Sequence, residues 1–301
     1  MEKFFTRVKE YAEAMRLPFL TASLFPFVAG SLAARQYSSL VFWLGLGAVI
    51  GTHTGANLLN DYADSRSGAD WQDLRPFKFF GGTKLIQSGR FSEQSVLRLA
   101  LLCLLFATGC VAGLALLLGD VKVLGLFILI VFLAAAYSLR PFQFAYRRVG
   151  EGIVFLLFGP ALVMGGYFLQ SGIFPDIKSF LLSLPFGFFT AAILLVNEIP
   201  DYSDDIRVGK RNLVSVSGAA SAYKLYLAVV VLGFLSIGVC LAAAIVRPAA
   251  GWSFLGIGIL PGIIRVLKEK YVAKVACVRS SQYTILLHGW VSAALIAGIV
   301  V

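Results

Sequence analysis

Long apolar runs constrain this chain more than any other feature. A helix needs about 20 apolar residues to cross a bilayer, and a chain with many such runs can satisfy its backbone in lipid only as helices. Of the 301 residues, 58% are hydrophobic and only 14% are charged. The sequence therefore predicts an all-α, polytopic membrane bundle of about nine spans, forming a single domain over 1–301. The runs lie near 17–34, 39–60, 97–118, 121–138, 151–169, 179–200, 223–246, 251–267 and 283–301.

The basic residues predict how this bundle is oriented. If the N-terminus is cytoplasmic, only four of the 26 Lys and Arg residues fall on the opposite side. This asymmetry follows the positive-inside rule and predicts a multi-pass protein of the cytoplasmic (inner) membrane. The lipid bilayer and an anionic substrate explain the net charge of +10, so we expect no nucleic-acid partner, and no obligatory protein partner is evident. The four exceptions are Arg35, Lys122, Lys178 and Arg247.

The first 16 residues carry an amphipathic pattern. Phe4, Val8, Tyr11 and Met15 recur at helical spacing, and charged residues occupy the other positions. Such a pattern is typical of a helix that lies in the membrane interface. We therefore expect 1–16 to form an interfacial helix that leads into the first span.

Two acidic segments repeat one pattern 140 residues apart. The first runs Asn57-Leu-Leu-Asn60-Asp61-Tyr62-Ala-Asp64, and the second runs Asn197-Glu198-Ile-Pro-Asp201-Tyr202-Ser-Asp204-Asp205. At helical spacing, Asn57, Asp61 and Asp64 share one face, as do Asn197, Asp201 and Asp205. Each copy ends a long apolar run, where helix carbonyls already carry partial negative charge. Carboxylates gathered there need a cation.

The ligand type indicates which cation this is. Oxygen ligands without a cluster of Cys or His favour Mg²⁺. Mg²⁺ typically binds one or two carboxylates together with substrate phosphates. The sequence therefore predicts that the two segments are halves of one diphosphate–Mg²⁺ site.

Further motifs extend the pattern. They are Ala14-Met-Arg16-x-Pro18, Asn60-Asp61-x-x-Asp64 with Gly68-x-Asp70, Gly81-Gly82-Thr83-Lys84, Tyr137-Ser138-x-x-Pro141, Gly150-Glu151, Gly165-Gly166-Tyr167-Phe168-Leu169-Gln170, and Asp201-x3-Asp205 with Gly209-Lys210-Arg211. With these motifs the chain resembles the intramembrane aromatic prenyltransferase superfamily, most strongly its 1,4-dihydroxy-2-naphthoate (menaquinone) branch. It departs from that branch at Arg148, where Gly is usual, at Asn212, where Thr is usual, and in the stretch 71–80.

The resemblance implies an enzyme that moves a polyprenyl chain from its diphosphate to an aromatic acceptor, in this branch 1,4-dihydroxy-2-naphthoate. It implies two Mg²⁺ ions, bound with the diphosphate. Asn57, Asp61 and Asp64 would hold one ion; Asp201 and Asp205, with Asn197, would hold the other. The four aspartates are the expected catalytic residues, because charge building on the leaving diphosphate must be neutralised.

Other side chains receive expected roles at this site. Diphosphate-binding cations are expected at Lys84, Arg147, Lys210 and Arg211. A ring that shields the allylic cation, or a contact to the acceptor, is expected from Tyr62, Tyr137, Tyr146, Glu151 and Tyr202. Further candidates are Asn60, Asp70, Arg148, Glu198 and Asp204.

Ordinary structural roles compete with several of these assignments. Tyrosines at membrane boundaries usually form an aromatic belt, and Lys210-Arg211 alone would be ordinary cytoplasmic charge. His53 lies one turn before Asn57, where a buried, hydrogen-bonded histidine is the simpler reading. Glu151, at the start of a predicted span, fits either a partner of the helix dipole or part of the acceptor site.

Three other functions are weighed against this one. A prenyltransferase with another acceptor, such as 4-hydroxybenzoate, another phenol or a lipid precursor, fits the same motifs. A cation transporter would also use intramembrane carboxylates, but near the midplane rather than at helix ends. A CDP-alcohol phosphotransferase lacks support because its D-G-x-x-A-R element is absent from this chain.

Overall fold

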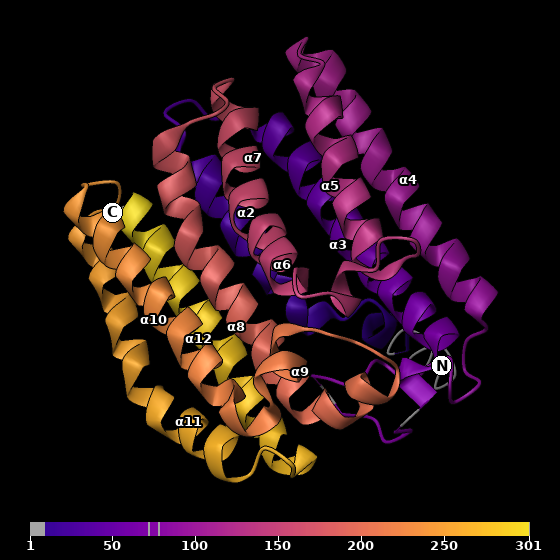
Figure 1. The fold of residues 1–301 in the computed structure, drawn as a ribbon. Helices are drawn as coiled ribbons and strands as arrows, with labels where there is room; N and C mark the ends of the chain where they lie inside the picture. Colours follow the sequence, from indigo (N-terminus) through magenta and orange to yellow (C-terminus); the bar gives the residue numbers. More distant parts are fainter. Residues whose placement is uncertain (1–9, 72, 78, 301) are drawn as a thin grey trace, which may run out of the picture.

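The computed structural model describes residues 10–71, 73–77 and 79–300 of the chain, and within them it is a bundle of helices without strands (Figure 1). The expected interfacial helix, 1–16, lies mostly outside the described residues. In the part that is described, 10–14 are helical. The α-helices are α2 (Thr21–Ala33), α3 (Ser39–Ser67), α4 (Glu93–Leu118), α5 (Lys122–Ser138), α6 (Gly150–Phe158), α7 (Pro160–Ser171), α8 (Ile177–Arg207), α9 (Leu213–Ser217), α10 (Ala219–Ala242), α11 (Leu260–Glu269) and α12 (Lys274–Val300). Short 3₁₀ helices are η1 (Leu17–Phe19), η2 (Ala69–Trp71) and η3 (Phe144–Tyr146), and a longer one is η4 (Pro248–Ile259).

Seven helical segments of the described chain are long and apolar enough to cross a membrane. Two of the nine expected spans form shorter apolar helices, α2 with 13 residues and α5 with 17. The all-α membrane fold is therefore confirmed, and the count of nine stays a prediction. The seven segments are Ser39–Ser67, Glu93–Leu118, Gly150–Ser171, Ile177–Arg207, Ala219–Ala242, Pro248–Glu269 and Lys274–Val300.

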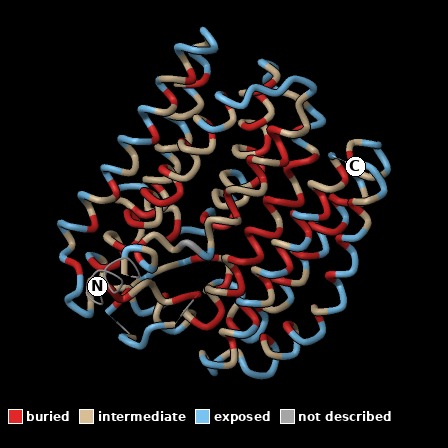
Figure 2. The backbone as a smooth tube through the Cα atoms, turned by 180° about the vertical axis from the view of Figure 1, so that it is seen from behind, coloured by how far each residue is buried: buried red, intermediate tan, exposed pale blue. Residues whose placement is uncertain are grey.

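The helices gather into two groups with α2, α6 and α7 between them (Figure 1). In one group α8 packs along α10 and α12, and their facing side chains form the largest buried cluster, which includes Phe186, Tyr226 and Leu287. In the other group α3 packs along α4 and contacts α5. Buried residues follow the inward faces of the helices, and exposed residues follow the outer faces (Figure 2). Apolar side chains on that outer surface are what a lipid-facing bundle requires.

One expected span, 151–169, is broken in the structure. The α6 helix ends at Gly159, and Pro160 begins α7, a position that proline favours because its missing N–H is not needed there. Gly159 lies against Gly187 of α8, where a Cβ would come within 2.8 Å of the Gly187 Cα and the Ser183 carbonyl oxygen. The break lets this segment pack closely on α8, one of the two helices that carry the acidic repeats.

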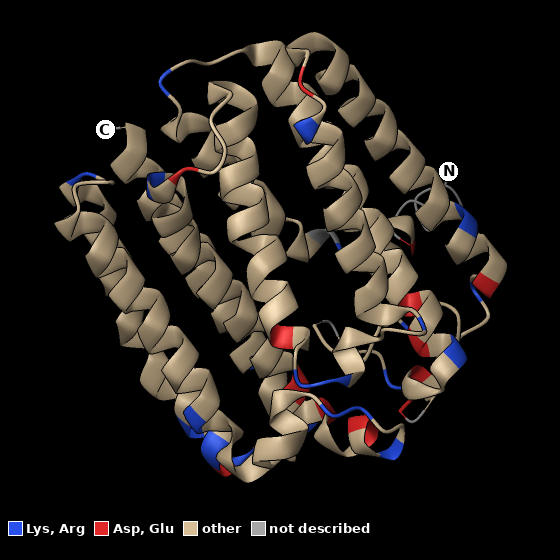
Figure 3. Cartoon of the chain, turned by 45° about the horizontal axis from the view of Figure 1, so that its top comes forward, with Lys and Arg blue, Asp and Glu red and all other residues tan. Residues whose placement is uncertain are grey.

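Charged residues gather mostly at one end of the bundle, with a few at the other end (Figure 3). The acidic repeats lie at this charged end because each occupies the last turns of a long helix, α3 or α8. The α3 helix ends at Gly68, whose positive φ of 87° caps the helix in the left-handed conformation. The fold thereby places two segments 140 residues apart at the same depth.

Candidate functional site

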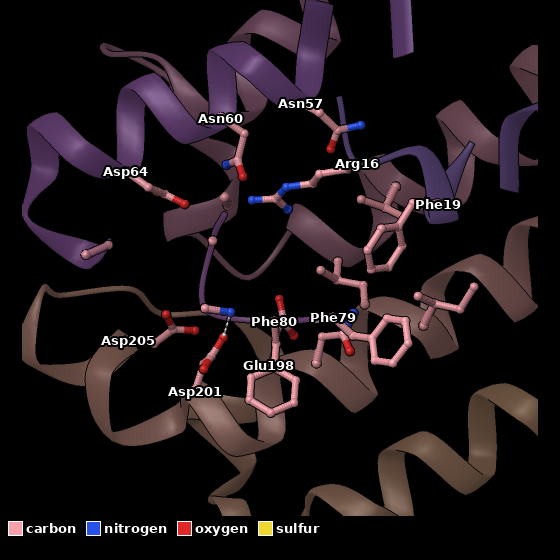
Figure 4. A pocket seen from close by; sticks show the side chains of 18 of the residues that line it. Arg16, Phe19, Asn57, Asn60, Asp64, Phe79, Phe80, Glu198, Asp201 and Asp205 are labelled. Atoms are coloured by element: carbon pink, nitrogen blue, oxygen red, sulfur yellow. Dashed lines mark hydrogen bonds between the residues drawn. The ribbon is translucent and has the colours of Figure 1, made fainter. Parts of the chain in front are cut away.

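A cavity of about 280 Å³ separates the two acidic repeats, and we refer to it as the charged cavity. Asn57, Asn60 and Asp64 line it from α3, and Asn197, Asp201 and Asp205 line it from α8. Figure 4 shows Asn57, Asn60 and Asp64 on one wall, and Asp201 and Asp205 on the opposite wall. Asp61 is buried beside this wall, with 5% of its surface exposed.

The first repeat is held by two basic residues from outside α3. The Arg16 guanidinium donates a hydrogen bond to Asp61 Oδ1, and the Thr83 hydroxyl donates to Asp61 Oδ2 at 2.7 Å. The Lys210 ammonium lies 3.6 Å from Asp64 Oδ2. Both carboxylates of the first repeat therefore already have a positive partner.

The second repeat is held in the same way. Asp201 Oδ2 accepts from the backbone N–H of Gly81 at 2.9 Å, and its Oδ1 lies 3.6 Å from the Lys274 ammonium. Asp205 lies 3.4 Å from Lys210 and accepts from the Asn212 amide at 2.9 Å. Because Lys210 contacts Asp64 as well, this one ammonium joins the two repeats.

The segment 81–84 ties the walls together from the loop between α3 and α4. Gly81 and Gly82 both have φ near 74°, a region that favours glycine. A Cβ on Gly82 would approach the Asp70 carboxylate oxygens to 2.4 Å. Lys84 is buried and donates to Asp70 Oδ1 at 3.1 Å and to the Asp70 carbonyl oxygen at 2.7 Å. The predicted diphosphate contact Lys84 is thus ion-paired with Asp70, although it also lines the charged cavity.

Burial and neighbouring charge set the protonation of the groups in the connecting loops. Burial alone would lower the pKa of the Lys210 ammonium, but Asp205 and Asp64 hold it well above its usual value. Burial raises the pKa of the Asp70 carboxyl to about 7, with Asp64 and Asp61 adding to the effect and Lys84 and Arg16 opposing it. Lys210 is therefore a fixed positive charge, whereas the charge of Asp70 changes near neutral pH.

Tyr146 supports the first repeat as a neutral phenol. Burial, with Asp64 and Asp205 nearby, raises its pKa to about 12. Its hydroxyl donates to Ser67 Oγ at 2.5 Å and lies 3.4 Å from Asp64 Oδ1, and its ring faces the Lys210 ammonium at 5.3 Å. These contacts place Tyr146, from η3, beside the first repeat and Lys210.

The remaining expected acids and polar residues lie close to the charged cavity. Tyr137, Glu198, Asp70 and Asp204 line it. Asn60 donates to Ser138 at 3.0 Å, which ties α3 to α5. Glu151 is buried, and its Oε1 accepts from the Leu213 N–H at 2.6 Å, so it fixes the loop that carries Lys210.

Several expected residues lie away from the charged cavity. Tyr62 packs against the cluster of Leu58 and Leu59, and Tyr202 packs against the main core. Arg147, Arg148 and Arg211 are exposed and are not among the residues that line the cavity. None of these five residues is among those that line the charged cavity, so the roles expected for them stay predictions.

Sequence reasoning missed two basic residues that the structure brings to the site. Arg16 lines the charged cavity and pairs with Asp61. Lys274, the first residue of α12, lines it too and lies 2.6 Å from Asp204, 3.0 Å from Asp73 and 3.6 Å from Asp201. From sequence, Arg16 belongs to the motif Ala14-Met-Arg16-x-Pro18 but receives no role at the site. Lys274 is predicted only as positive charge at a membrane boundary, and nothing in the spacing around it sets it apart.

A second, apolar cavity of about 160 Å³ adjoins the charged one, and we refer to it as the apolar cavity. His53, Ala56, Ala134, Leu157 and Phe158 line both cavities. Beyond them, residues such as Phe27, Leu114, Phe127 and Leu169 form its walls. A polar, charged chamber therefore continues into a hydrocarbon-lined one within the bundle.

Fold and cavities together define an integral membrane protein with an oxygen-rich, cation-rich site at one end of a helical bundle. Comparison with known families makes this specific. The chain belongs to the UbiA prenyltransferase family, which it matches over residues 23–294. It is therefore a transferase, and the transporter alternative has no support.

Named relatives agree with the branch that the motifs indicated. A 1,4-dihydroxy-2-naphthoate octaprenyltransferase of Mycobacterium leprae is 29% identical over 251 residues, which cover 81% of this chain and 79% of the relative. The enzyme of that name from Escherichia coli is 26% identical over 91% of this chain and 88% of its own length. UbiA prenyltransferase domain-containing protein 1 of mouse is 30% identical over 72% of this chain and 63% of its own length. The predicted resemblance to the naphthoate branch is confirmed.

Solved structures show the same fold. The apo structure of a UbiA homologue from Aeropyrum pernix superimposes with a TM-score of 0.70 at 17% identity, covering 94% of this chain and 98% of that one. A UbiA homologue from Archaeoglobus fulgidus, solved with GPP and Mg²⁺, gives a TM-score of 0.58 at 13% identity, covering 95% and 99%.

Proposed function

We propose that this chain transfers a polyprenyl group from polyprenyl diphosphate to an aromatic acceptor in a Mg²⁺-dependent reaction. One observation carries the proposal. Two acidic repeats and the basic residues Arg16, Lys84, Lys210 and Lys274 line a single cavity that adjoins an apolar one. Such a pair of chambers suits a substrate with a charged head and a hydrocarbon tail.

The donor set of the second repeat fits a divalent cation. Asn197 Oδ1 and Asp201 Oδ1 are buried oxygens, one helical turn apart, without a hydrogen-bond partner in the described structure. Asp201 Oδ1 has only the longer ion-pair contact, 3.6 Å from the Lys274 ammonium, among the described residues. Oxygen donors of this kind are what Mg²⁺ prefers. No group of three or more His, Cys, Asp or Glu within the described residues is arranged to hold an ion unaided, so diphosphate oxygens would have to complete the coordination. A relative from Archaeoglobus fulgidus was solved with both GPP and Mg²⁺.

In this proposal two ions would bind with the diphosphate, one beside Asn57, Asp61 and Asp64 and one beside Asn197, Asp201 and Asp205. Bound Mg²⁺ would neutralise charge on the leaving diphosphate. Arg16, Lys210 and Lys274 now neutralise these carboxylates. With Mg²⁺ bound, these three side chains would be free to donate to phosphate oxygens instead.

The chain's own residues would also protect the reactive intermediate. Once the C–O bond breaks, the allylic cation needs an electron-rich surface and the exclusion of water. We propose Tyr137, which lines the charged cavity from α5, for this role, whereas Tyr146 is not among the lining residues and its ring faces the Lys210 ammonium at 5.3 Å. Apolar side chains at the junction, including Phe158 and Leu157, keep water away from the prenyl chain.

For the acceptor we propose 1,4-dihydroxy-2-naphthoate, as the motifs and the named relatives of that branch favour. Its hydroxyls make the ring electron-rich enough to attack the cation, and substitution at the carboxylated carbon releases CO₂. Purified protein with Mg²⁺ and a labelled polyprenyl diphosphate should convert this naphthoate to a prenylated naphthoquinol, identified by mass spectrometry. Prenylation of 4-hydroxybenzoate or another phenol, with the naphthoate unreacted, would refute the proposed acceptor but not the family assignment.

We also propose that the charged end of the bundle faces the cytoplasm, with the N-terminus on that side. Support comes from the basic asymmetry of the sequence and from the clustering of charge in Figure 3. Single cysteines placed at Ser88 or Arg211 should stay unlabelled when intact cells meet a membrane-impermeant thiol reagent. A cysteine replacing Lys178, at the opposite end, should react. Labelling of position 88 or 211 from outside would contradict the proposed orientation.

A further inference from the structure

His53 occupies the junction between the charged and apolar cavities. Among the described residues that line both cavities, four are apolar and the fifth is His53. It lies on α3 one turn before Asn57, which places it about 6 Å deeper in the bundle. A polar group at a hydrocarbon-lined junction costs free energy unless it finds a partner.

The imidazole is held in place by one of its two nitrogens. Nδ1 lies 2.7 Å from the Ser23 hydroxyl of α2, and the ring edge packs against Phe158 at 5.9 Å between centroids. Nε2 is buried and has no hydrogen-bond partner in the described structure, and only 7% of the residue is exposed. The side chain is therefore fixed, with one polar atom unsatisfied.

The chemistry of the two substrates decides what this atom can bind. The polyprenyl chain has no polar atom apart from its diphosphate. The diphosphate belongs with Arg16, Lys210 and Lys274, which line the charged cavity but not the apolar one. The remaining candidate partner for Nε2 at the junction is an oxygen on the ring of the acceptor.

We propose that His53 is a specificity residue that hydrogen-bonds a ring oxygen of the aromatic acceptor through Nε2, with Ser23 as its positioning partner. This inference rests on the proposed function. A neutral imidazole whose Nδ1 is engaged by a hydroxyl presents Nε2 as either donor or acceptor. A phenolic hydroxyl can pair with either form, whereas a prenyl chain pairs with neither.

Binding measurements separate this role from a structural one. Titrations of purified protein would use 1,4-dihydroxy-2-naphthoate and, separately, farnesyl diphosphate with Mg²⁺. His53→Leu should weaken naphthoate binding about tenfold or more and leave farnesyl diphosphate binding within about twofold. His53→Gln, which keeps a polar end, should recover most of the loss, and Ser23→Ala should fall between wild type and His53→Leu. A matched control is Thr54→Val, because Thr54 is buried on the same helix and lines neither cavity, and its hydroxyl donates to the Ile50 carbonyl within its own helix.

The substrate provides the second half of the test. 1-Hydroxy-2-naphthoate and 4-hydroxy-2-naphthoate each lack one hydroxyl, and wild type should bind one of them about tenfold more weakly than the parent. His53→Leu should bind the parent naphthoate and that analogue with nearly equal affinity. Equal weakening of both substrates, or an unchanged preference between parent and analogue, would make His53 a packing residue and overturn the proposal. If the acceptor panel selects 4-hydroxybenzoate instead, the same comparison is made with that phenol and benzoate, so the two proposals fail separately.

Discussion

Replacing Asp61, Asp64, Asp201 or Asp205 by alanine is expected to lower turnover by about three orders of magnitude while the protein stays inserted and folded. Each change removes negative charge from a site where, in the proposed reaction, a metal would stabilise the leaving diphosphate by about several kcal/mol. Each ~1.4 kcal/mol is about a factor of ten in rate. Turnover would be measured as labelled prenyl product from purified protein in lipid nanodiscs. Yield and the elution profile report the fold.

The same substitution at the opposite end of the bundle is the control. Asp120 lies in the turn between α4 and α5, where its Oδ1 accepts from the Lys122 N–H at 2.9 Å. Asp120→Ala should therefore keep nearly full activity. Lys210 contacts both Asp64 and Asp205. Asp64→Ala and Asp205→Ala should therefore each lower the affinity for the diphosphate, and by similar amounts. Near-normal turnover in Asp64→Ala or Asp201→Ala would refute the assignment of the repeats.

The pairing of the two repeats could be predicted from sequence because only local rules are needed. Both repeats end long apolar helices, so the membrane fixes their depth, and the helical period fixes which residues share a face. The structure accordingly places Asn57, Asp64, Asn197, Asp201 and Asp205 around one cavity.

The same period explains why two expected tyrosines lie elsewhere. Tyr62 follows Asp61 and Tyr202 follows Asp201, and neighbouring residues on a helix point about 100° apart. Each ring therefore turns from the cavity toward a packed interior, beside Leu58 for Tyr62 and in the main core for Tyr202. The sequence already contained this information, because helical spacing, rather than membership of the repeated motif, decides which side chains face the cavity.

Other features depend on tertiary contacts that no spacing reveals. The Gly81 N–H reaches Asp201 and the Thr83 hydroxyl reaches Asp61, so one short loop segment contacts both repeats. Lys274 meets Asp201 only because α12 begins beside the end of α8. A lysine in a basic membrane-boundary segment looks the same whether it faces solvent or the site.

Removal of divalent metal is the second large expected effect. Treatment with EDTA should abolish turnover, and added Mg²⁺ should restore it, because the diphosphate cannot leave without charge neutralisation. Product formation by mass spectrometry, with and without chelator, measures this. Turnover that survives EDTA would contradict a metal-dependent reaction at these repeats.

The ion pairs within the site predict that metal loss leaves the empty protein folded. Arg16, Lys210 and Lys274 already neutralise Asp61, Asp64, Asp201 and Asp205, so EDTA alone should shift the melting temperature little. Farnesyl diphosphate with Mg²⁺ should raise it, since a ligand that binds only the folded state stabilises that state by mass action. The same diphosphate with EDTA should raise it much less. A large fall in melting temperature on chelation without substrate would show instead that the metal is a structural part of the fold. In that case the basic side chains would be too few or too distant to balance the charge of the acidic repeats.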